Sequence, residues 1–248
     1  MYHKVKSIVK SLVPKSLLFW SEPFLRRYFL YPMYRGINYK CTVCEASLKA
    51  FITLPNGDRL CPRCGSLARD RRLSHLLNDR YLKGVSSILD FSPSRCHFRK
   101  MKKKFSDGYV STDLSRDFIH DKEFDIRSLD VRNETFDIII CYHVLEHVIE
   151  DEKAMLELFR VLKPAGICLV QTPFKEGEIY EDYSFTSEKD RLREFGQKDH
   201  VRIYSVSGLK SRLEKSGFIV NALNFKEKAD NQLGFAAKET VLELKRPQ

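Results

Sequence analysis

Short apolar runs and amphipathic segments alternate along the C-terminal two thirds of the chain. Runs of strand length lie at 87–91, 108–113, 136–141, 167–172, 218–225 and 240–245. Segments with apolar positions at helical spacing lie between them at 96–104, 150–162 and 207–216. Because strands that alternate with helices form parallel crossovers, this pattern predicts an α/β fold with a doubly wound, mostly parallel sheet. The near-continuous apolar run Phe136–Cys141 is typical of a strand buried on both faces.

The same pattern divides the chain into three parts. Residues 1–38 form a basic, aromatic segment predicted to be helical, and residues 39–84 hold a cysteine module followed by an Arg-rich helix at 67–83. Residues 85–248 form the α/β domain. Within it, the polar stretch 174–204 shows no clear period, which is typical of a lid or of a loop that contacts a substrate.

Aromatic side chains recur at helical spacing in the first segment, at Phe24, Tyr28 and Tyr31, with arginines between them. Two interpretations are open. A basic amphipathic helix with aromatic residues can lie on a membrane surface, so peripheral membrane contact is one of them. The other, which we favour, is that the stripe packs on the rest of the protein, as most aromatic stripes do.

Positive charge is concentrated at the N-terminal end. The chain carries a formal net charge of +10, and residues 1–85 hold 16 Lys and Arg against 5 Asp and Glu. This third of the chain is therefore the part expected to meet an anion, such as RNA, an acidic lipid surface or a phosphorylated substrate, unless it is only a solvated basic surface. No apolar run reaches the roughly 18 residues of a spanning helix, and the basic start lacks the features of a secretory signal. We expect a cytoplasmic protein without a transmembrane segment.

Four of the seven cysteines form two C-x2-C pairs, Cys41 with Cys44 and Cys61 with Cys64, separated by 16 residues. This spacing can deliver four thiolates to one tetrahedral Zn²⁺, and the turn signal at 55–58 predicts a hairpin between the pairs. Gly65 suits the positive φ of such a turn. The pattern indicates a zinc-ribbon-like module with a structural Zn²⁺, because four cysteines leave no position for a catalytic water. A redox pair is the alternative.

Polar residues follow the ends of the predicted parallel strands. Doubly wound folds bind ligands at the carboxyl ends of their strands, where the strand order reverses. The residues that follow these strands are Asp90, Asp113, the 125–130 segment, His143 and Thr172. Asp113 lies about where such folds place a carboxylate that grips ribose hydroxyls. For each aspartate taken alone, a helix cap or a loop residue is the favoured interpretation.

The run from Phe136 to Thr172, with FDIIICYHVLEHV and then LFRVLKPAG, resembles class I S-adenosylmethionine-dependent methyltransferases. The resemblance covers about 86–225 and is strongest at 125–173. The stretch FGQKDHVRIY at 195–204 is similar to bacterial members with a cysteine-rich module at the front. The resemblance implies a Rossmann-like fold, S-adenosylmethionine as cofactor and a set of cofactor-binding residues. Asp113 and Leu114 would lie at the ribose, Asp125 and Ile126 at the adenine, Tyr142 and His143 near the methionine sulfur, and Asp90 near its amino group.

The chain departs from that family in the loop after the first strand. The glycine-rich loop of the family is replaced by Asp90–Arg95, which contains no glycine. Either the loop takes another path, or cofactor binding is weak or lost, since Pro and Ser do not replace glycine conformationally. Ser92 could compensate in part by bonding the methionine carboxylate.

Three histidines are candidates for a general base that would activate a hydroxyl acceptor, namely His143, His147 and His200. Glu146 and His147 begin the next helix, where either could instead be a cap. His200 with Arg202 and Tyr204 could bind an anionic or sugar acceptor, or could form a hydrogen-bonded structural cluster.

Three functions remain open. The favoured one is methyl transfer to a small-molecule or glycan-type acceptor, through oxygen. The second is RNA methylation with the basic zinc module as the RNA-binding part, although the Asn/Asp-Pro-Pro-aromatic signature of amine-directed enzymes is missing. The third is a non-catalytic binding module that retains the fold.

Overall fold

The computed structural model describes residues 15–226 and 230–248 and divides into two compact units. The smaller unit comprises Met1–Leu77, Arg95–Lys100 and Glu227–Ala236. The larger unit comprises Asn78–Ser94, Met101–Lys226 and Ala237–Gln248. The division at 38 and 84 that the sequence suggests stays a prediction.

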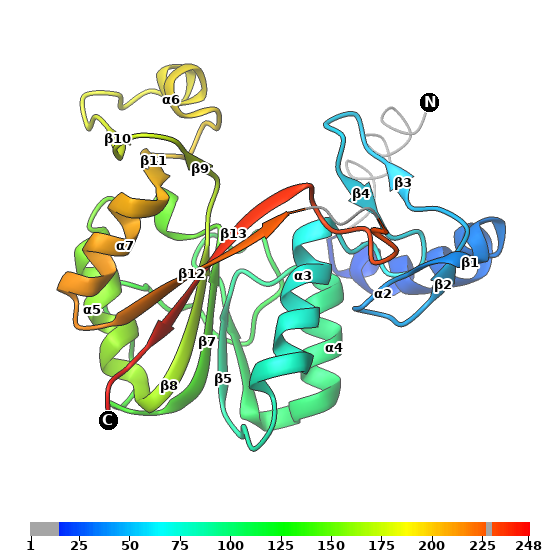
Figure 1. Ribbon diagram of the computed structural model, residues 1–248, viewed down its shortest axis with the longest axis horizontal. Helices are drawn as coiled ribbons and strands as arrows, with labels where there is room; N and C mark the ends of the chain where they lie inside the picture. The colour runs from blue at the N-terminus through cyan, green and yellow to red at the C-terminus, as the bar shows by residue number, and fades with distance from the viewer. Residues whose placement is uncertain (1–14, 227–229) are drawn as a thin grey trace. The chain divides into compact units, whose positions relative to one another are not determined.

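A six-stranded sheet forms the centre of the larger unit, with the strand order β12-β13-β8-β7-β5-β6 (Figure 1). The four strands β5 to β8 run parallel, and β13 and β12 are added antiparallel at one edge. This confirms the predicted doubly wound, mostly parallel α/β fold. The strands are β5 (Ile88–Phe91), β6 (Tyr109–Thr112), β7 (Phe136–Tyr142), β8 (Leu162–Gln171), β12 (Ile219–Lys226) and β13 (Lys238–Lys245).

The connections between the parallel strands place helices on both faces of the sheet. Helix α4 (Arg95–Phe105) joins β5 to β6, and helix α5 (Asp151–Val161) joins β7 to β8 (Figure 1). The two connections step in opposite directions across the sheet, so right-handed crossovers put the helices on opposite faces. Helix α7 (Val206–Lys215) packs with α5 beside the β8–β13–β12 side. The core between them is aliphatic, with fully buried Ile139, Met155, Leu158, Leu209 and Leu242.

The stretch 174–204 contains regular structure that the sequence pattern did not reveal. Strands β9 (Phe174–Lys175), β10 (Tyr180–Glu181) and β11 (Arg202–Ser205) form a small sheet in the order β10-β11-β9, and helix α6 (Glu188–Phe195) lies between β10 and β11. Two-residue strands are too short to show alternation, and α6 buries only Phe195. The expectation that this stretch is irregular was therefore wrong. A role as a lid or as a segment that contacts the substrate stays a prediction.

The smaller unit begins with helix α2 (Lys15–Leu25) and short helical turns at Arg26–Leu30 and Tyr31–Tyr34. Two antiparallel pairs follow, β1 (Arg35–Lys40) with β2 (Ser47–Leu48) and β3 (Ile52–Thr53) with β4 (Arg59–Leu60). Helix α3 (Ala68–Leu76) comes next, and the π-helical turn Leu77–Tyr81 that follows it belongs, from Asn78 onward, to the larger unit. The predicted helical segment 1–38 thus ends in strand β1, and its first 14 residues lie outside the described residues.

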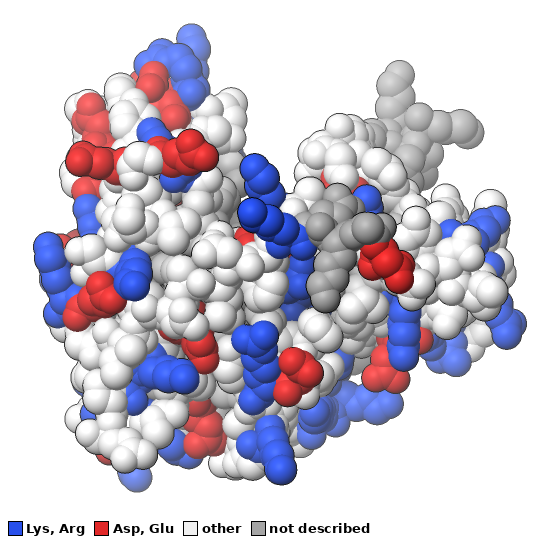
Figure 2. All heavy atoms as spheres, in the orientation of Figure 1, with Lys and Arg blue, Asp and Glu red and all other residues white. Residues whose placement is uncertain are grey.

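The aromatic stripe of the N-terminal segment is largely exposed. Trp20, Phe24 and Tyr28 are 75%, 57% and 58% exposed, whereas Tyr31 packs against the core of the smaller unit. The favoured interpretation, that the stripe packs on the rest of the protein, is therefore wrong for Phe24 and Tyr28 and agrees with the position of Tyr31. Among the described residues no helix is long and apolar enough to cross a membrane. Lys and Arg are interspersed with Asp and Glu over the face of the larger unit that Figure 2 shows.

Candidate functional site

The ends of the four parallel strands meet at one edge of the sheet. Phe91 pairs in register with Thr112 on one side and Cys141 on the other, and Tyr142 pairs with Gln171. The residues that follow these strands are therefore brought together, whereas Asp90, which the sequence placed after the first strand, lies within β5. They are Ser92 after β5, Asp113 after β6, His143 after β7 and Thr172 after β8. The strand order reverses between β5 and β7, which is where ligands bind in such sheets.

Ser92 and Asp113 are joined directly. Ser92 Oγ donates to Asp113 Oδ1 at 2.7 Å, and the Ser92 amide donates to the Thr112 carbonyl at 2.8 Å. Asp113 Oδ2 accepts from Ser115 Oγ at 2.8 Å and from the Phe118 amide at 3.2 Å. Ser92 has φ +48°, so it makes a left-handed turn without glycine. The loop after β5 therefore reaches the neighbouring strand end, and its serine orients the aspartate.

The other predicted cofactor residues differ in their surroundings. The carboxylate of Asp90 is buried and accepts from the Tyr109 hydroxyl at 2.7 Å. The Arg127 guanidinium donates hydrogen bonds to both carboxylate oxygens of Asp125, the shortest from Nη2 to Oδ2 at 2.6 Å. These hydrogen bonds lower the pKa of Asp125. The side chain of Ile126 is in the core, whereas Leu114 is 58% exposed. Of this group, Leu114 and Asp125 remain accessible to a ligand.

His143 follows β7 in a left-handed conformation with φ +55°. Its amide donates to the Gln171 carbonyl at 2.7 Å, which holds the residue at the end of β8. Its Nδ1 lies 3.4 Å from Oε1 of Glu146, a carboxylate that is only 1% exposed. Burial alone would raise the pKa of Glu146, but His143 beside it keeps that pKa below its usual value. His143 Nε2 is buried and has no hydrogen-bond partner among the described residues.

His147 and His200 lie edge to face, with ring centroids 4.7 Å apart. His147 belongs to a short 3₁₀ helix, Leu145–His147, so it does not begin α5 as the sequence suggested. Its Nδ1 lies 3.3 Å from both a carboxylate oxygen and the carbonyl of Asp199. Burial and the nearby His147 lower the pKa of His200. The structure thus brings the three candidate histidines to one region, together with Glu146, which sequence reasoning treated only as a cap.

Arg202 is not available to an acceptor. Its guanidinium is completely buried, and its Nε donates to Glu181 Oε2 at 2.8 Å. Its two terminal nitrogens donate to the carbonyl groups of Leu145, Val148 and Ile149 and to two tyrosine hydroxyls. Every N–H is therefore paired within the chain. Of the two interpretations of this segment, the structure supports the hydrogen-bonded structural cluster for Arg202.

The four cysteines of the two C-x2-C pairs converge on one point in the smaller unit. Cys41 Sγ lies 3.7 Å from Cys64 Sγ, and Cys44 Sγ lies 3.8 Å from Cys61 Sγ. All four sulfurs are within 4.8 Å of one another, and none forms a disulfide. A tetrahedral Zn²⁺ with Zn–S bonds of about 2.3 Å places its sulfurs about 3.8 Å apart. The residues present therefore fit this ion.

The backbone explains how the sulfurs converge. In the first pair the Glu45 amide donates to the Cys41 carbonyl at 2.8 Å, and in the second the Gly65 amide donates to the Cys61 carbonyl at 2.9 Å. Glu45 and Gly65 both have positive φ, +60° and +79°. The two pairs are thus matching knuckles, with the β3–β4 hairpin between them as expected. The predicted positive φ of Gly65 is confirmed.

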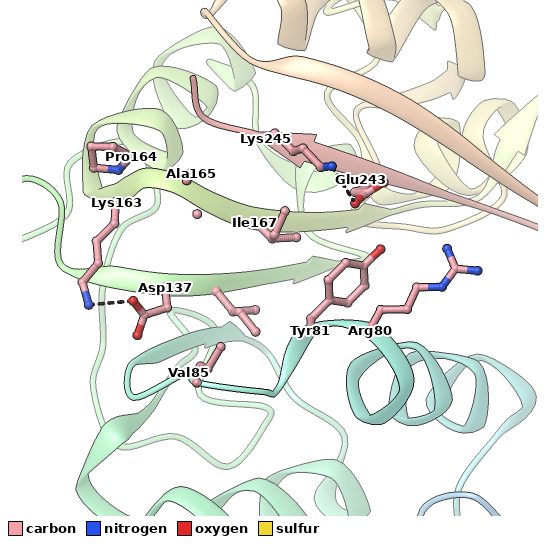
Figure 3. A pocket seen from close by; sticks show the side chains of 13 residues that line it. Arg80, Tyr81, Val85, Asp137, Lys163, Pro164, Ala165, Ile167, Glu243 and Lys245 are labelled. Carbon is pink, nitrogen blue, oxygen red and sulfur yellow. Dashed lines mark hydrogen bonds and ion pairs between the residues drawn. The ribbon is translucent and has the colours of Figure 1, made fainter. Parts of the chain in front are cut away.

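A pocket that the sequence did not predict opens at the other edge of the sheet, where β7 and β8 begin (Figure 3). Lys163 Nζ donates to Asp137 Oδ1 at 2.7 Å, and Ser86 and Ser87 donate to Oδ2. Burial alone would raise the pKa of Asp137, but these hydrogen bonds hold it well below its usual range. Burial and Glu243 raise the pKa of Tyr81 to about 12. Because both carboxylates that line this pocket are already paired, Asp137 with Lys163 and Glu243 with Lys245, it has no evident ligand chemistry.

Comparison with known proteins supports the assignment of the fold. A family model described as a methyltransferase domain matches residues 67–223. A SAM-dependent methyltransferase from Archaeoglobus fulgidus superposes with a TM-score of 0.52 at 16% identity, over 72% of this chain and 93% of that one. A chain from the Haloferax volcanii complex between the Trm112 methyltransferase activator and a methyltransferase gives 0.51 at 12%, over 73% and 94%. A comparison with curated proteins found no match.

Proposed function

The chain belongs to the methyltransferase domain family, and we propose that it transfers the methyl group of S-adenosylmethionine to an oxygen atom of a small-molecule or glycan-type acceptor. The observation that carries the oxygen assignment is the pair His143 and Glu146. A histidine held by a buried carboxylate, with its second nitrogen unbonded, is the arrangement of a general base. This pair follows β7, beside the switch point of the sheet.

The strand ends fit the cofactor. Asp113 keeps acceptor capacity for ribose hydroxyls, because its oxygens offer about four lone-pair positions and the chain supplies three donors. Thr172 Oγ1 and Gln171 Oε1 are buried without a hydrogen-bond partner among the described residues, which favours a polar ligand at this edge. Leu114, Asp125 and Tyr142 would complete the cofactor-binding residues. When bound, S-adenosylmethionine supplies an electrophilic methyl group on a sulfonium.

The chain's own contribution to the reaction is alignment and proton removal. His143 Nε2 would accept the proton of the acceptor hydroxyl, and Glu146 is a positioning residue that holds the ring through Nδ1. Such a base contributes about 10²- to 10⁴-fold to the rate. His147 and His200 are the other candidates for this role.

The cysteine cluster would hold a structural Zn²⁺. Cys41, Cys44, Cys61 and Cys64 would all be ligands, and a site with four thiolates leaves no open position for substrate. The ion would therefore stabilise the knuckles and take no part in the chemistry. The fit of the sulfur–sulfur distances to a tetrahedron supports this assignment.

Isothermal titration calorimetry with S-adenosylmethionine and S-adenosylhomocysteine tests the cofactor. We expect micromolar binding to the zinc-loaded chain, at least tenfold weaker binding for Asp113→Ala, and no change for Asp107→Ala, an exposed residue in the turn before β6. No binding by a folded wild-type chain would overturn the enzyme proposal and leave the third function, a binding module that retains the fold.

Transfer of an isotopically labelled methyl group tests the acceptor and the base. We expect label in the small-molecule or glycan fraction of an extract, and, at a saturating concentration of S-adenosylmethionine, a rate at least 10²-fold lower for His143→Gln. A variant that transfers at the wild-type rate would exclude His143 as the base.

The excess of positive charge in residues 1–85 favours RNA as the alternative acceptor. Recovery of the label in RNA, together with RNA binding that weakens steeply as the salt concentration is raised, would show that the acceptor is RNA and not a small molecule or glycan. Contact of the exposed aromatic stripe with a membrane surface stays a prediction.

A further inference from the structure

Glu146, His147 and His200 form a second cluster of potential metal ligands, separate from the cysteines. Each offers one ligand atom, and these three atoms lie within 4.8 Å of one another. Glu146 and His147 are neighbours in a 3₁₀ helix, and His200 precedes β11. The Val201 amide donates to the Glu146 carbonyl at 2.9 Å, so the backbone itself fixes one segment against the other.

The cluster is buried and polar, and the chain does not satisfy its polar atoms. Glu146 and His200 are 1% and 4% exposed. Within the described part of the chain, neither carboxylate oxygen of Glu146 has a hydrogen-bond partner by strict geometry, and neither does His200 Nε2. The His143 ring lies beside this carboxylate, with Nδ1 3.4 Å from Glu146 Oε1. A buried carboxylate is costly unless it is paired or coordinates a metal, so this cluster is incomplete as it stands.

We propose that Glu146, His147 and His200 bind a divalent transition-metal ion. Two imidazole nitrogens and one carboxylate oxygen are the ligands of catalytic Zn²⁺ sites and of mononuclear Fe²⁺ sites. Three protein ligands leave at least one coordination position open, in contrast to the four thiolates of the cysteine cluster. The ion therefore accepts an exogenous oxygen ligand.

The surroundings of the three ligands fit this assignment. The second ring N–H of a metal-binding histidine usually donates a hydrogen bond to a carboxylate or a carbonyl, which orients the ring. His147 Nδ1 lies 3.3 Å from both such groups of Asp199, which leaves Nε2 for the ion. Ligating carboxylates are hydrogen-bonded in turn, and His143 Nδ1 is placed to donate to Glu146 Oε1. Asp199 and His143 are thus positioning residues for the metal ligands.

The proposed site follows β7, next to the proposed base His143, and its role in methyl transfer rests on the proposed function. An ion with an open position selects acceptors that carry an oxygen ligand, above all those with two adjacent oxygens that can chelate. It also makes the proton of a coordinated hydroxyl easier to remove. The acceptor class that this site fits is therefore a vicinal diol, a catechol or a hydroxy acid.

Metal stoichiometry tests the site independently of activity. The full chain is stripped with a chelator, reloaded with Zn²⁺ or Co²⁺, desalted and measured by inductively coupled plasma mass spectrometry. We expect the wild type to hold one equivalent of metal per chain more than His200→Ala or Glu146→Gln. His120 lies outside the cluster, so His120→Ala should hold as much metal as the wild type. We also expect Asp199→Ala to bind the second ion about 10- to 100-fold more weakly.

Cobalt spectroscopy separates this site from the cysteines. The thiolate-to-cobalt charge-transfer band reports only cobalt bound to the cysteine cluster. The intensity of this band should therefore be the same in His200→Ala and the wild type, although the variant holds one equivalent of cobalt less. Equal metal content in the wild type and both folded variants would overturn the site. Calorimetry with S-adenosylmethionine on the same samples tests the proposed function separately, because cofactor binding should persist when the second metal is lost.

Discussion

The hydroxyl group of Ser92 donates a hydrogen bond to Asp113 Oδ1 at 2.7 Å, and so joins the ends of two neighbouring parallel strands. Ser92 does this from a left-handed conformation with φ +48°, where glycine is normally favoured. The loop after β5 therefore makes a left-handed turn at Ser92, although it contains no glycine. Two hydrogen bonds from Ser92, one from its side chain and one from its amide, offset the backbone cost.

The conformational cost at Ser92 can be measured with two substitutions that both remove the hydroxyl. The free energy of unfolding of Ser92→Gly should be roughly 1 kcal/mol higher than that of Ser92→Ala, because only glycine adopts positive φ without penalty. The glycine variant should thus be the more stable one. Urea denaturation measures both. The exposed helical Ser211 is the control, and there the order should reverse, since Gly is less favourable than Ala in a helix by about 0.5–1 kcal/mol. Equal stability of the two Ser92 variants would contradict the strained turn.

Removal of one cysteine should separate metal binding from ordinary core packing in the smaller unit. Cys44→Ser should lose one equivalent of zinc and lower the thermal midpoint, because a structural metal contributes directly to folding stability. Cys96→Ala is the matched control: Cys96 is buried in the same core cluster but is not among the four converging sulfurs. Its zinc content should stay that of the wild type. Mass spectrometry and calorimetric melting measure the two effects, and full zinc retention by Cys44→Ser would exclude a four-cysteine site.

The sequence predicted the main sheet well because its central strands, β5 and β7, are buried on both faces. Apolar runs such as Phe136–Cys141 are the direct consequence of that burial, and their order along the chain gives the parallel crossovers. The small β9–β10–β11 sheet escaped detection for the opposite reason. Its strands have two to four residues, and β10 is only half-buried, so no period could be established.

Only the residues of the candidate site that directly follow a buried strand could be predicted from the sequence. Asp113 and His143 follow buried strands, and the parallel register brings strand ends together. The contacts that define their surroundings are non-local. Glu146 meets His200 across a separation of 54 positions, and Ser92 reaches Asp113 through a φ that serine rarely adopts. Neither relationship leaves a spacing pattern in the sequence.

Asp137 should make stability depend on pH at acid values. Its folded pKa lies below that of an unfolded aspartate, about 3.9, so its stabilising contribution is complete above that value and is lost as the pH falls through the folded pKa. Asp137→Asn should cost about 1.5–3 kcal/mol at pH 7, the range for hydrogen bonds to a charged group. The difference from the wild type should narrow below pH 4. Urea denaturation at pH 7 and pH 3 measures this, with the exposed Asp107→Asn as control; a pH-independent difference would contradict the assignment.

Arg202 should matter for folding and not for acceptor binding. Its guanidinium is completely buried, pairs with Glu181 Oε2 at 2.8 Å and lies 3.3 Å from Asp151 Oδ2. Arg202→Met leaves several buried carbonyl groups without donors, so it should lower the free energy of unfolding by about 3 kcal/mol or more. Arg193→Met, on the exposed face of α6, should change it by less than about 0.5 kcal/mol. Guanidinium denaturation measures both. An Arg202→Met chain with wild-type stability but a raised KM for the acceptor would instead place this arginine at the substrate.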